Sequence, residues 1–327
     1  MGERIEDVSV VGGGDAGLLT ALALKQMNPG LDVSVIDDFG QPIPQVGKST
    51  FLAIQHILHE NLDIDEQSFV EEVKPVWKAS VYFRDWCGYD EFHYPFDQSR
   101  KFPNPDERDT NEAYYFYYSE LYNSEDHQSK CEEMVSQGKS PWHFSPREGG
   151  NRKYENVAYH LNTERFNSYL RDLCRDRGIS LIDDEIVTVD VANDRIQRLR
   201  SKRQAYHADL YVDATGFSRV LRSEQDSEFR EFDLPLDAAL NARSDLSLEE
   251  VVPATVIDTG DAGWFWQIDT FDNRDRGYVY ASDYVSEAEA REEFVDHCEG
   301  IDADDVVKYE FTPGYHERSW IENCDRS

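Results

Sequence analysis

The sequence predicts an α/β fold whose core is a doubly wound sheet, and three consecutive features support this. Residues 8–11 form an apolar, β-branched run that enters a glycine-rich turn. A helical pattern follows and is closed by Pro29 and Gly30, and a second apolar run covers residues 33–36. Strand, helix and strand in this order make a βαβ unit of about 30 residues, from which doubly wound sheets are built.

The next part of the chain predicts a helix, a strand and a long insertion. After a proline-rich loop at residues 41–44, the spacing of apolar residues predicts a helix from Ser49 to Leu62, and alternation predicts a strand over residues 76–83. Residues 84–150 are rich in aromatic residues, proline and glycine. We interpret them as an irregular insertion on the substrate side, because ordered aromatics beside turn residues often line pockets.

A regular pattern returns at Tyr159. Helical spacing predicts a helix capped by Asn162 or Thr163, with Gly178 just past its end. The later elements are predicted from apolar runs and turn residues: a strand at 179–182, a hairpin that turns at Asn193-Asp194, a strand at 208–213, and two strands and a helix within residues 251–294.

Composition excludes several function classes. The chain has 33 Lys plus Arg against 66 Asp plus Glu, a net charge of −33, and such a field repels nucleic acid. The 39% of hydrophobic residues is enough for a substantial core. Because the carboxylates are spread throughout and lysine is scarce, we favour a protein from a halophile; an ordinary acidic surface is the alternative.

Cysteine usage and hydropathy bear on location. The five cysteines form no C-x-x-C pair, and the odd number does not suggest a disulfide framework. No apolar stretch approaches the ~20 residues needed to cross a bilayer, and the N-terminus enters a strand directly. We therefore expect a cytoplasmic protein without a membrane partner.

The glycine-rich turn carries the first functional signal. Gly12-x-Gly14-x-x-Gly17 lies between the first strand and the first helix, and includes Ala16. These glycines allow a tight turn, close approach of a pyrophosphate and close packing of helix on strand. Asp37 follows at the distance where a carboxylate accepts a ribose hydroxyl. The pattern predicts a dinucleotide-binding site. It does not separate flavin from nicotinamide cofactors, because proteins that bind either one share this fingerprint.

A series of sequence blocks follows the glycine turn along the whole chain. In chain order they are Pro44 to Thr50, Trp77-Lys78-Ala79, Tyr82-Phe83-x-x-Trp86, Tyr159-His160-Leu161, Asp209 to Phe217, Trp264 to Ile268 and Gly277 to Tyr280. The W-x-W-x-I block is the most specific, because two tryptophans at this spacing are rare by composition. Together with the glycine turn, these blocks resemble the flavin-dependent tryptophan halogenase family.

The resemblance implies a fold, a cofactor and a reaction. It implies the FAD/NAD(P)-binding doubly wound flavoprotein fold with an interleaved aromatic-rich substrate module. The chain would be one flavoprotein unit, with FAD-binding segments at about 5–62 and 155–222 and substrate-side segments at about 70–150 and 223–327. Reduced FAD from a separate flavin reductase would act with dioxygen and a halide on an aromatic, indole-type substrate.

The resemblance also assigns roles to residues. Lys78 matches the catalytic lysine that presents the halogen to an electron-rich ring, and an amine held among aromatics is expected to have a lowered pKa. Trp264 and Trp266 are expected to wall the path between flavin and substrate. We expect the cofactor to be bound by Gly12, Gly14, Ala16, Gly17, Asp37, Lys48, Val187, Asp213 and Gly216.

The sequence departs from the family pattern in ways that keep alternatives open. Lys48 replaces a usual Glu, Asp269 a usual Pro and Phe51 a frequent Pro. The family's G-x-A-x-G-F-x-E-P-L-E-S-T segment, with its flavin, halide and glutamate contacts, is missing, so we expect a C-terminally truncated form. A FAD-dependent monooxygenase that hydroxylates, or an inactive FAD-binding remnant, are the alternatives. His56 and His59 do not suggest a metal site, because no third ligand joins them.

Overall fold

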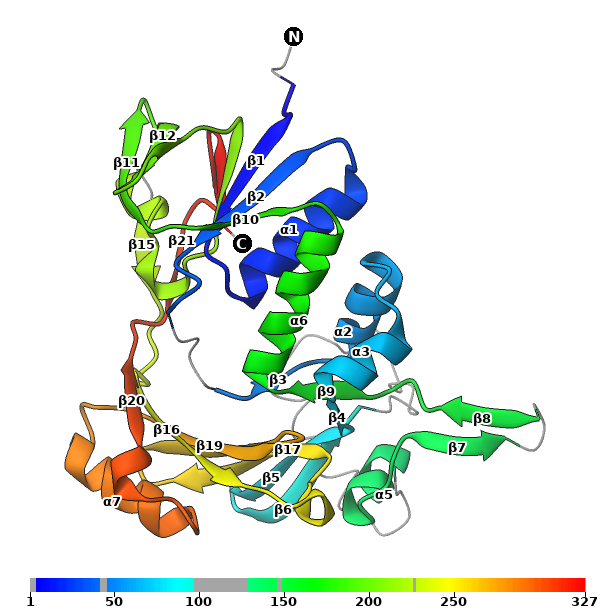
Figure 1. Ribbon diagram of the computed structural model, residues 1–327. Helices are drawn as coiled ribbons and strands as arrows, with labels where there is room; N and C mark the ends of the chain where they lie inside the picture. Colours follow the sequence, from blue (N-terminus) through cyan, green and yellow to red (C-terminus); the bar gives the residue numbers. More distant parts are fainter. Residues whose placement is uncertain (1–3, 42–45, 97–128, 146–148, 226–227, 327) are drawn as a thin grey trace, which may run out of the picture.

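The computed structural model describes residues 4–41, 46–96, 129–145, 149–225 and 228–326. Its first layer is a sheet that is parallel except at one edge (Figure 1), in the order β10-β2-β1-β14-β23-β22. The strands are β1 (Asp7–Val11), β2 (Asp32–Asp37), β10 (Ser180–Asp183), β14 (Leu210–Asp213), β22 (Trp320–Ile321) and β23 (Cys324–Arg326). The βαβ unit predicted from the sequence is confirmed, because β1 pairs in parallel with β2. The strand predicted at 208–213 is β14, which pairs in parallel with β1 on its other side.

Two helices cover one face of this sheet. Helix α1 (Asp15–Met27) joins β1 to β2 and packs against α6 (Thr163–Asp176). The cap of α6 is Asn162, one of the two predicted candidates, whose side chain accepts a hydrogen bond from the Arg165 amide. Valines of β1 and β2 and leucines of the two helices form one buried core. Burial of this apolar face stabilises the layer.

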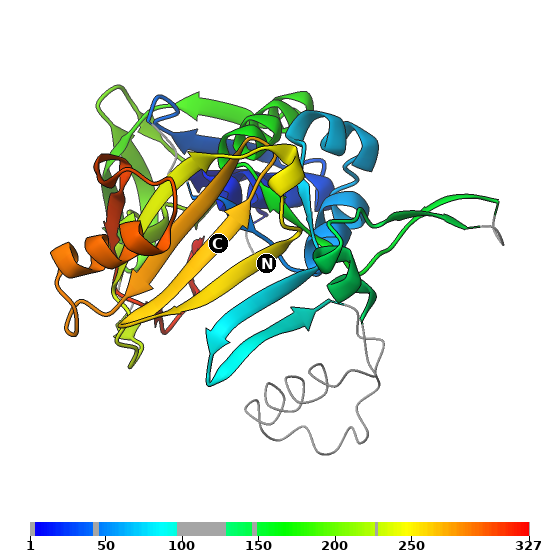
Figure 2. The same ribbon diagram turned by 90° about the horizontal axis from the view of Figure 1, so that it is seen from below.

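The second layer is a seven-stranded sheet at the other end of the molecule (Figures 1 and 2), in the order β20-β16-β19-β18-β17-β5-β6. Its strands are β5 (Ser80–Trp86), β6 (Tyr89–Pro95), β16 (Ala238–Asp245), β17 (Ala254–Gly260), β18 (Gly263–Asp269), β19 (Asn273–Tyr280) and β20 (Val307–Glu310). Helix α7 (Glu287–His297) covers its outer face, where Phe294 stacks on Phe265. Side chains alternate along a strand, so Trp264 and Trp266 point to the opposite, inner face.

A small antiparallel sheet lies between the two layers, in the order β3-β9-β4. Its strands are β3 (Lys48–Ser49), β4 (Val76–Lys78) and β9 (Ala158–Leu161). All four residues of β9 are buried, so polar groups here need partners within the protein. A separate hairpin sheet consists of β11 (Ile186–Ala192), β12 (Arg195–Ser201) and β13 (Ala205–Tyr206). It turns as predicted at Asn193 and Asp194, whose φ angles are 51° and 60°.

The remaining elements are short. They are α2 (Ala53–Gln55), the π-helical η1 (His56–Asn61), α3 (Glu66–Val73), α5 (Lys130–Ser136), β7 (Trp142–Ser145), β8 (Gly150–Lys153), β15 (Phe229–Glu231), β21 (Gly314–His316) and the 3-10 turns η3 (Gly216–Ser218), η4 (Arg222–Glu224), η5 (Leu248–Glu250) and η6 (Ala303–Asp305). No helix in the described ranges is long and apolar enough to cross a membrane.

Two sequence predictions at the centre of the molecule were wrong. The helix predicted from Ser49 begins only at Ala53, because Ser49 pairs with His160 as part of β3. The single strand predicted over residues 76–83 is two strands in two sheets, β4 and β5, with Ala79 between them. The Ala79 amide donates to the Pro253 carbonyl, which redirects the chain from one sheet to the other.

Two further predictions underestimated the regular structure. Residues 84–150 are not irregular where described, because they contain β6, α5, β7 and β8; residues 97–128 and 146–148 lie outside the described residues. Residues 251–294 contain three strands, β17 to β19, and not two. Sequence patterns indicate such strands poorly, because the packing of a strand against its neighbours stabilises it more than its residue preferences do.

Candidate functional site

The glycine turn after β1 is shaped by close backbone contacts. Gly12 has a φ of +110°, and a Cβ there would lie 2.3 Å from the Ala214 carbonyl oxygen. A Cβ on Gly17 would lie 1.9 Å from the Gly12 carbonyl oxygen. A Cβ on Gly14 would meet nothing within 4 Å. The first and third glycines are therefore required by packing, and the second leaves space beside the helix N-terminus.

A groove of about 520 Å³ opens beside this turn, at the carboxyl ends of β1, β2 and β14. Its polar wall includes Asp37, whose carboxylate accepts a hydrogen bond of 2.7 Å from the Gly13 amide. Residues lining the groove include Gly12, Gly13, Gly14, Asp37, Arg171, Asp184, Ile186, Thr215 and Gly216. Such a crevice at the ends of parallel strands, next to a helix N-terminus, suits a dinucleotide.

Four of the predicted cofactor residues line the groove together: Gly12, Gly14, Asp37 and Gly216. The other five lie around it. Gly17 packs beneath the turn, Ala16 is exposed in the first turn of α1, and Lys48 forms an ion pair of 3.2 Å with Asp15. Val187 is 48% exposed and its neighbour Ile186 lines the groove, while Asp213 is buried.

The Asp213 carboxylate supports the turn after β14. It accepts hydrogen bonds from the amide and hydroxyl of Thr215 and from the amides of Leu221 and Arg222. Its position behind the groove therefore holds Thr215 and Gly216 in place. In the described residues it bonds only to this turn, so it would act on a nucleotide through the backbone that it orders.

Arg171 is a groove residue that the sequence reasoning missed. Its guanidinium lies 4.6 Å from the centre of the Phe39 ring, and its Nε is buried without a hydrogen-bond partner. Burial lowers its pKa, with Asp37 acting in the opposite direction. The available signal was its position on α6 four residues after Asn167, which donates to the Gly13 carbonyl at 3.1 Å.

Lys78 ends β4 inside the small central sheet and is 6% exposed. Its Nζ donates to the Ser49 hydroxyl at 2.7 Å and to the Thr50 carbonyl at 3.1 Å, and lies 5.2 Å from the centre of the Phe96 ring. Burial lowers its pKa to about 8. A desolvated amine without a bonded carboxylate is partly neutral near neutral pH and can act as a nucleophile.

A run of buried polar side chains continues from Lys78. The Ser49 hydroxyl lies 2.7 Å from the Thr255 hydroxyl, which lies 2.9 Å from His160 Nε2. His160 Nδ1 lies 3.0 Å from the Asp269 carbonyl oxygen. Burial, followed by the nearby Lys78 charge, lowers the pKa of His160 to about 3. The sequence placed Ser49 and His160 in motifs but assigned them no role, and nothing in the sequence indicated Thr255.

The two tryptophans lie on the inner face of the seven-stranded sheet, with ring centres 5.9 Å apart. Trp266 pairs with Ile257 on one side and Gly277 on the other, and a Cβ on Gly277 would come within 2.0 Å of its ring. Thr255 lies two residues before Ile257 and so shares this face. The tryptophans therefore share a sheet face with the Lys78 hydrogen-bonded run.

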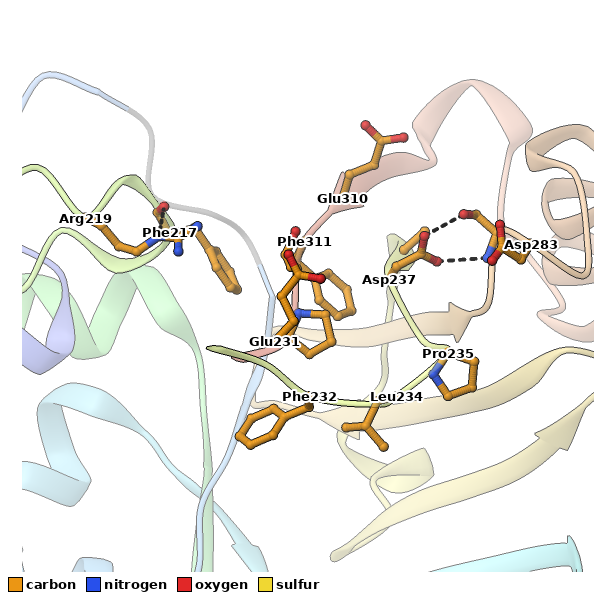
Figure 3. Close-up of a pocket in the computed structure, with 14 residues that line it drawn as sticks. Phe217, Arg219, Glu231, Phe232, Leu234, Pro235, Asp237, Asp283, Glu310 and Phe311 are labelled. Atoms are coloured by element: carbon orange, nitrogen blue, oxygen red, sulfur yellow. Dashed lines mark hydrogen bonds between the residues drawn. The ribbon is translucent and has the colours of Figure 1, made fainter. Parts of the chain in front are cut away.

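A second hollow, of about 600 Å³, lies on the other side of the turn that follows β14. Figure 3 shows Phe217 and Arg219 approaching it from that turn, opposite Phe311, Glu310 and Asp237 from the ends of the seven-stranded sheet. The rings of Phe217 and Phe311 stack at 6.3 Å. None of the sequence-predicted site residues lines this hollow.

Comparison with known sequences gives a consistent result. The sequence model described as tryptophan halogenase matches residues 7–325. The tryptophan 6-halogenase SttH of Streptomyces toxytricini is 29% identical over an alignment that covers 98% of this chain and 66% of that protein. The tryptophan 7-halogenase RebH of Lentzea aerocolonigenes is 25% identical, with 99% and 65% covered. The chain thus spans just under two thirds of the length of these relatives.

Solved structures agree on the architecture. The chain matches MibH, a tryptophan 5-halogenase, with a TM-score of 0.84 and 28% identity, over 98% of this chain and 61% of MibH. It matches BrvH, a flavin-dependent halogenase from Brevundimonas sp. BAL3, with a TM-score of 0.79 and 25% identity, over 99% and 67% of the two chains.

Proposed function

The chain belongs to the tryptophan halogenase family, and on that premise we propose that it is a FAD-dependent halogenase. It would use reduced FAD from a separate flavin reductase, dioxygen and a halide to halogenate an aromatic, indole-type molecule. Its α/β fold is that of solved flavin-dependent halogenases. The relatives that carry tryptophan halogenase names support a substrate of the tryptophan type.

The groove beside the glycine turn fits FAD. Its open space at Gly14 leaves room for a pyrophosphate, and Asp37 offers a carboxylate for a ribose hydroxyl. Arg171 adds a buried donor with no partner at Nε. Bound reduced FAD would supply the electrons that activate dioxygen. Lys48, Asp213 and Val187 would act around the groove, by ion pairing, turn support and apolar contact.

The observation that carries the proposal is the buried amine of Lys78, held among polar groups and an aromatic ring. A neutral amine can donate a hydrogen bond to hypohalous acid, or take its halogen with loss of water and pass it to an electron-rich ring. Trp264 and Trp266 would wall the path that the oxidant takes. The FAD-binding and substrate-side segments would follow the ranges predicted from the sequence.

The cellular setting completes the proposal. All five cysteines are free thiols, which supports a reducing compartment such as the cytoplasm. The net charge of −33 supports a cytoplasm rich in salt, as in a halophile, where ions screen the repulsion among carboxylates.

The test is product analysis of the purified chain. With a flavin reductase, FAD, NADH, chloride or bromide and a panel of indoles, mass spectrometry is expected to show replacement of one hydrogen by halogen. Lys78→Met is expected to reduce halogenated product at least about a thousandfold, because the amine that presents the halogen is removed. Lys202→Met is the matched control, since the Lys202 side chain is 78% exposed.

Three outcomes contradict the proposal. Addition of oxygen in place of halogen identifies a hydroxylase. Halogenation retained by Lys78→Met removes the role assigned to this lysine. Failure of the chain to bind FAD in a fluorescence titration removes the basis for any flavin chemistry.

A further inference from the structure

The hydrogen bonds that leave Lys78 run in one direction only. A backbone carbonyl can only accept, so the Asp269 carbonyl requires His160 Nδ1 to carry a proton. With its lowered pKa, His160 is neutral at ordinary pH, and its Nε2 can then only accept. The Thr255 hydroxyl must therefore donate to His160, and the Ser49 hydroxyl must donate to Thr255. The Ser49 oxygen is left to accept from Lys78.

This direction has a consequence for the amine. Neither of its two polar partners can donate to nitrogen, because the Ser49 proton is engaged with Thr255 and the Thr50 carbonyl has no proton. When Lys78 loses a proton, both N–H groups that point to these acceptors are retained. The lone pair must therefore develop at the remaining position on Nζ.

We propose that Ser49, Thr255 and His160 are positioning residues that keep the lone pair of Lys78 free and pointed away from Ser49 and Thr50. The inference rests on the proposed function in one respect, because it is halogen transfer that would use the free lone pair. Without the donation from Ser49 to Thr255, the Ser49 hydroxyl could turn and donate to the amine, which would block the lone pair. The chain of donors also strengthens the bond that holds the ammonium, because successive hydrogen bonds polarise one another.

The ionisable groups around Lys78 do not change this assignment over the working pH range. His160 faces it from β9 and titrates near pH 3. On β6, His93 bonds the Ser80 hydroxyl and has a pKa lowered by burial to about 4. Asp269 and Asp275 on the neighbouring sheet form ion pairs of 2.7 Å with Arg274 and Arg243. On β3, Lys48 pairs with Asp15, and on β17, Asp258 pairs with Arg84 and His297.

The test measures the amine itself and needs no halogenase activity. The full chain is treated with cyanate between pH 6 and 11, and the carbamylation of Lys78 is measured by peptide mass spectrometry. The neutral amine reacts with isocyanic acid, whose share of the reagent falls as the pH rises, so each rate is divided by the concentration of isocyanic acid. In the wild type, this corrected rate at Lys78 is expected to reach half of its plateau near pH 8. The exposed Lys202 serves as the internal reference in every sample.

Two variants separate positioning from structural support. Thr255→Val removes the acceptor of the Ser49 proton, so the plateau rate at Lys78 is expected to fall about fivefold, the factor that corresponds to one neutral hydrogen bond on the lone pair. Thr255→Ser restores the hydroxyl and is expected to restore the rate. Ser49→Ala removes a bond to the ammonium, so it is expected to lower the midpoint while the plateau is kept.

The outcomes are decisive in each direction. An unchanged plateau in Thr255→Val, or no carbamylation of wild-type Lys78 up to pH 11, overturns the proposal. A thermal melt checks that Thr255→Val is folded. If it is not, the Ser49→Ala variant decides: a midpoint pH of Lys78 carbamylation that is unchanged or raised in this variant is enough to overturn the proposal. In the halogenase assay, Thr255→Val is expected to lower kcat and leave KM unchanged. Absence of halogenation by the wild type, with the expected carbamylation pattern, would reject the proposed function and not this inference.

Discussion

Single residues in this chain show how surroundings change the same functional group. Within the described part of the chain, Lys78 is buried and bonds only to neutral oxygens, and its pKa is lowered to about 8. Lys308 bonds to the carboxylates of Glu287 and Glu310, and its pKa is raised. Desolvation favours the neutral amine and a carboxylate favours the charged amine, so these two lysines suit opposite roles. Only the first can be a nucleophile near neutral pH.

The buried amine predicts a pH dependence of stability. The pKa of Lys78 is about 8 in the folded protein and is 10.5 for a free side chain, so the unfolded chain binds more protons between these values. The free energy of unfolding of the wild type should therefore rise with pH across this window relative to Lys78→Met, by up to about 3 kcal/mol. Urea denaturation at pH 7, 8, 9 and 10 measures it. Parallel curves for the two proteins would contradict the assigned burial, and Lys202→Met should follow the wild type.

At the scale of elements, the site depends on strands that end or begin at the right residue. β4 ends at Lys78 and β5 begins at Ser80, so one residue separates the central sheet from the seven-stranded sheet. β3 is only two residues long, yet it brings Ser49 beside Lys78. Helix α6 reaches the glycine turn through Asn167, which donates to the Gly13 carbonyl and to Asp15. These contacts connect the groove beside the glycine turn to the rest of the fold.

A substitution at Gly14 in the glycine turn should weaken FAD binding without destabilising the fold. Gly14→Ala places a methyl group in open space, and its φ of −68° is accessible to alanine, so stability should change by less than about 1 kcal/mol. FAD binding should weaken about tenfold or more, because the pyrophosphate has to approach the backbone at this glycine. Fluorescence titration with FAD and a thermal melt measure the two effects.

A second glycine provides the control. Gly30→Ala also adds a methyl group in open space, but it lies at the far end of α1 from the groove. It should leave the affinity for FAD unchanged. Equal affinities of the Gly14→Ala variant and the wild type would show that the groove is not the pyrophosphate site.

Across the whole molecule, charge is divided between a few enclosed pairs and an open acidic surface. The carboxylates of Asp269 and Asp275 are fully buried, and each is paired with an arginine. The chain has 66 acidic and 33 basic residues, so at least half of the carboxylates have no lysine or arginine of their own to pair with. Repulsion among these carboxylates opposes the compact state unless ions screen it.

This charge predicts stabilisation by salt. Raising KCl from 0.1 M to 2 M, which shortens the screening length from about 10 Å to below about 3 Å, should raise the melting temperature by several degrees. Sucrose at matched osmolality is the control, since it stabilises compact states by exclusion without screening charge. A melting temperature that rises equally in sucrose and in KCl, or falls in KCl, would contradict the electrostatic explanation.

Local patterns were sufficient for the part of the fold around the glycine turn. Neighbouring residues predicted the run from β1 through the glycine turn to β2 and the hairpin turn at Asn193-Asp194. They also limited the cap of α6 to Asn162 or Thr163, of which the structure has Asn162. Patterns failed where pairing between distant segments overrides local preference. Ser49 looked helical but lies in β3, which pairs with β9. The strand predicted over residues 76–83 is divided between β4 and β5, which pair with β9 and with β17.

The sequence alone determined the doubly wound sheet, its glycine turn and the choice of Lys78 as the candidate amine, because each depends on residues close together in the chain or on a motif. Only the tertiary structure decided what surrounds that amine. Ser49, Thr255 and His160 come from three strands separated by up to 206 positions, and their hydrogen bonds exist only after two sheets have packed together. Burial and hydrogen-bond direction are properties of that packing, so no local pattern could have predicted them.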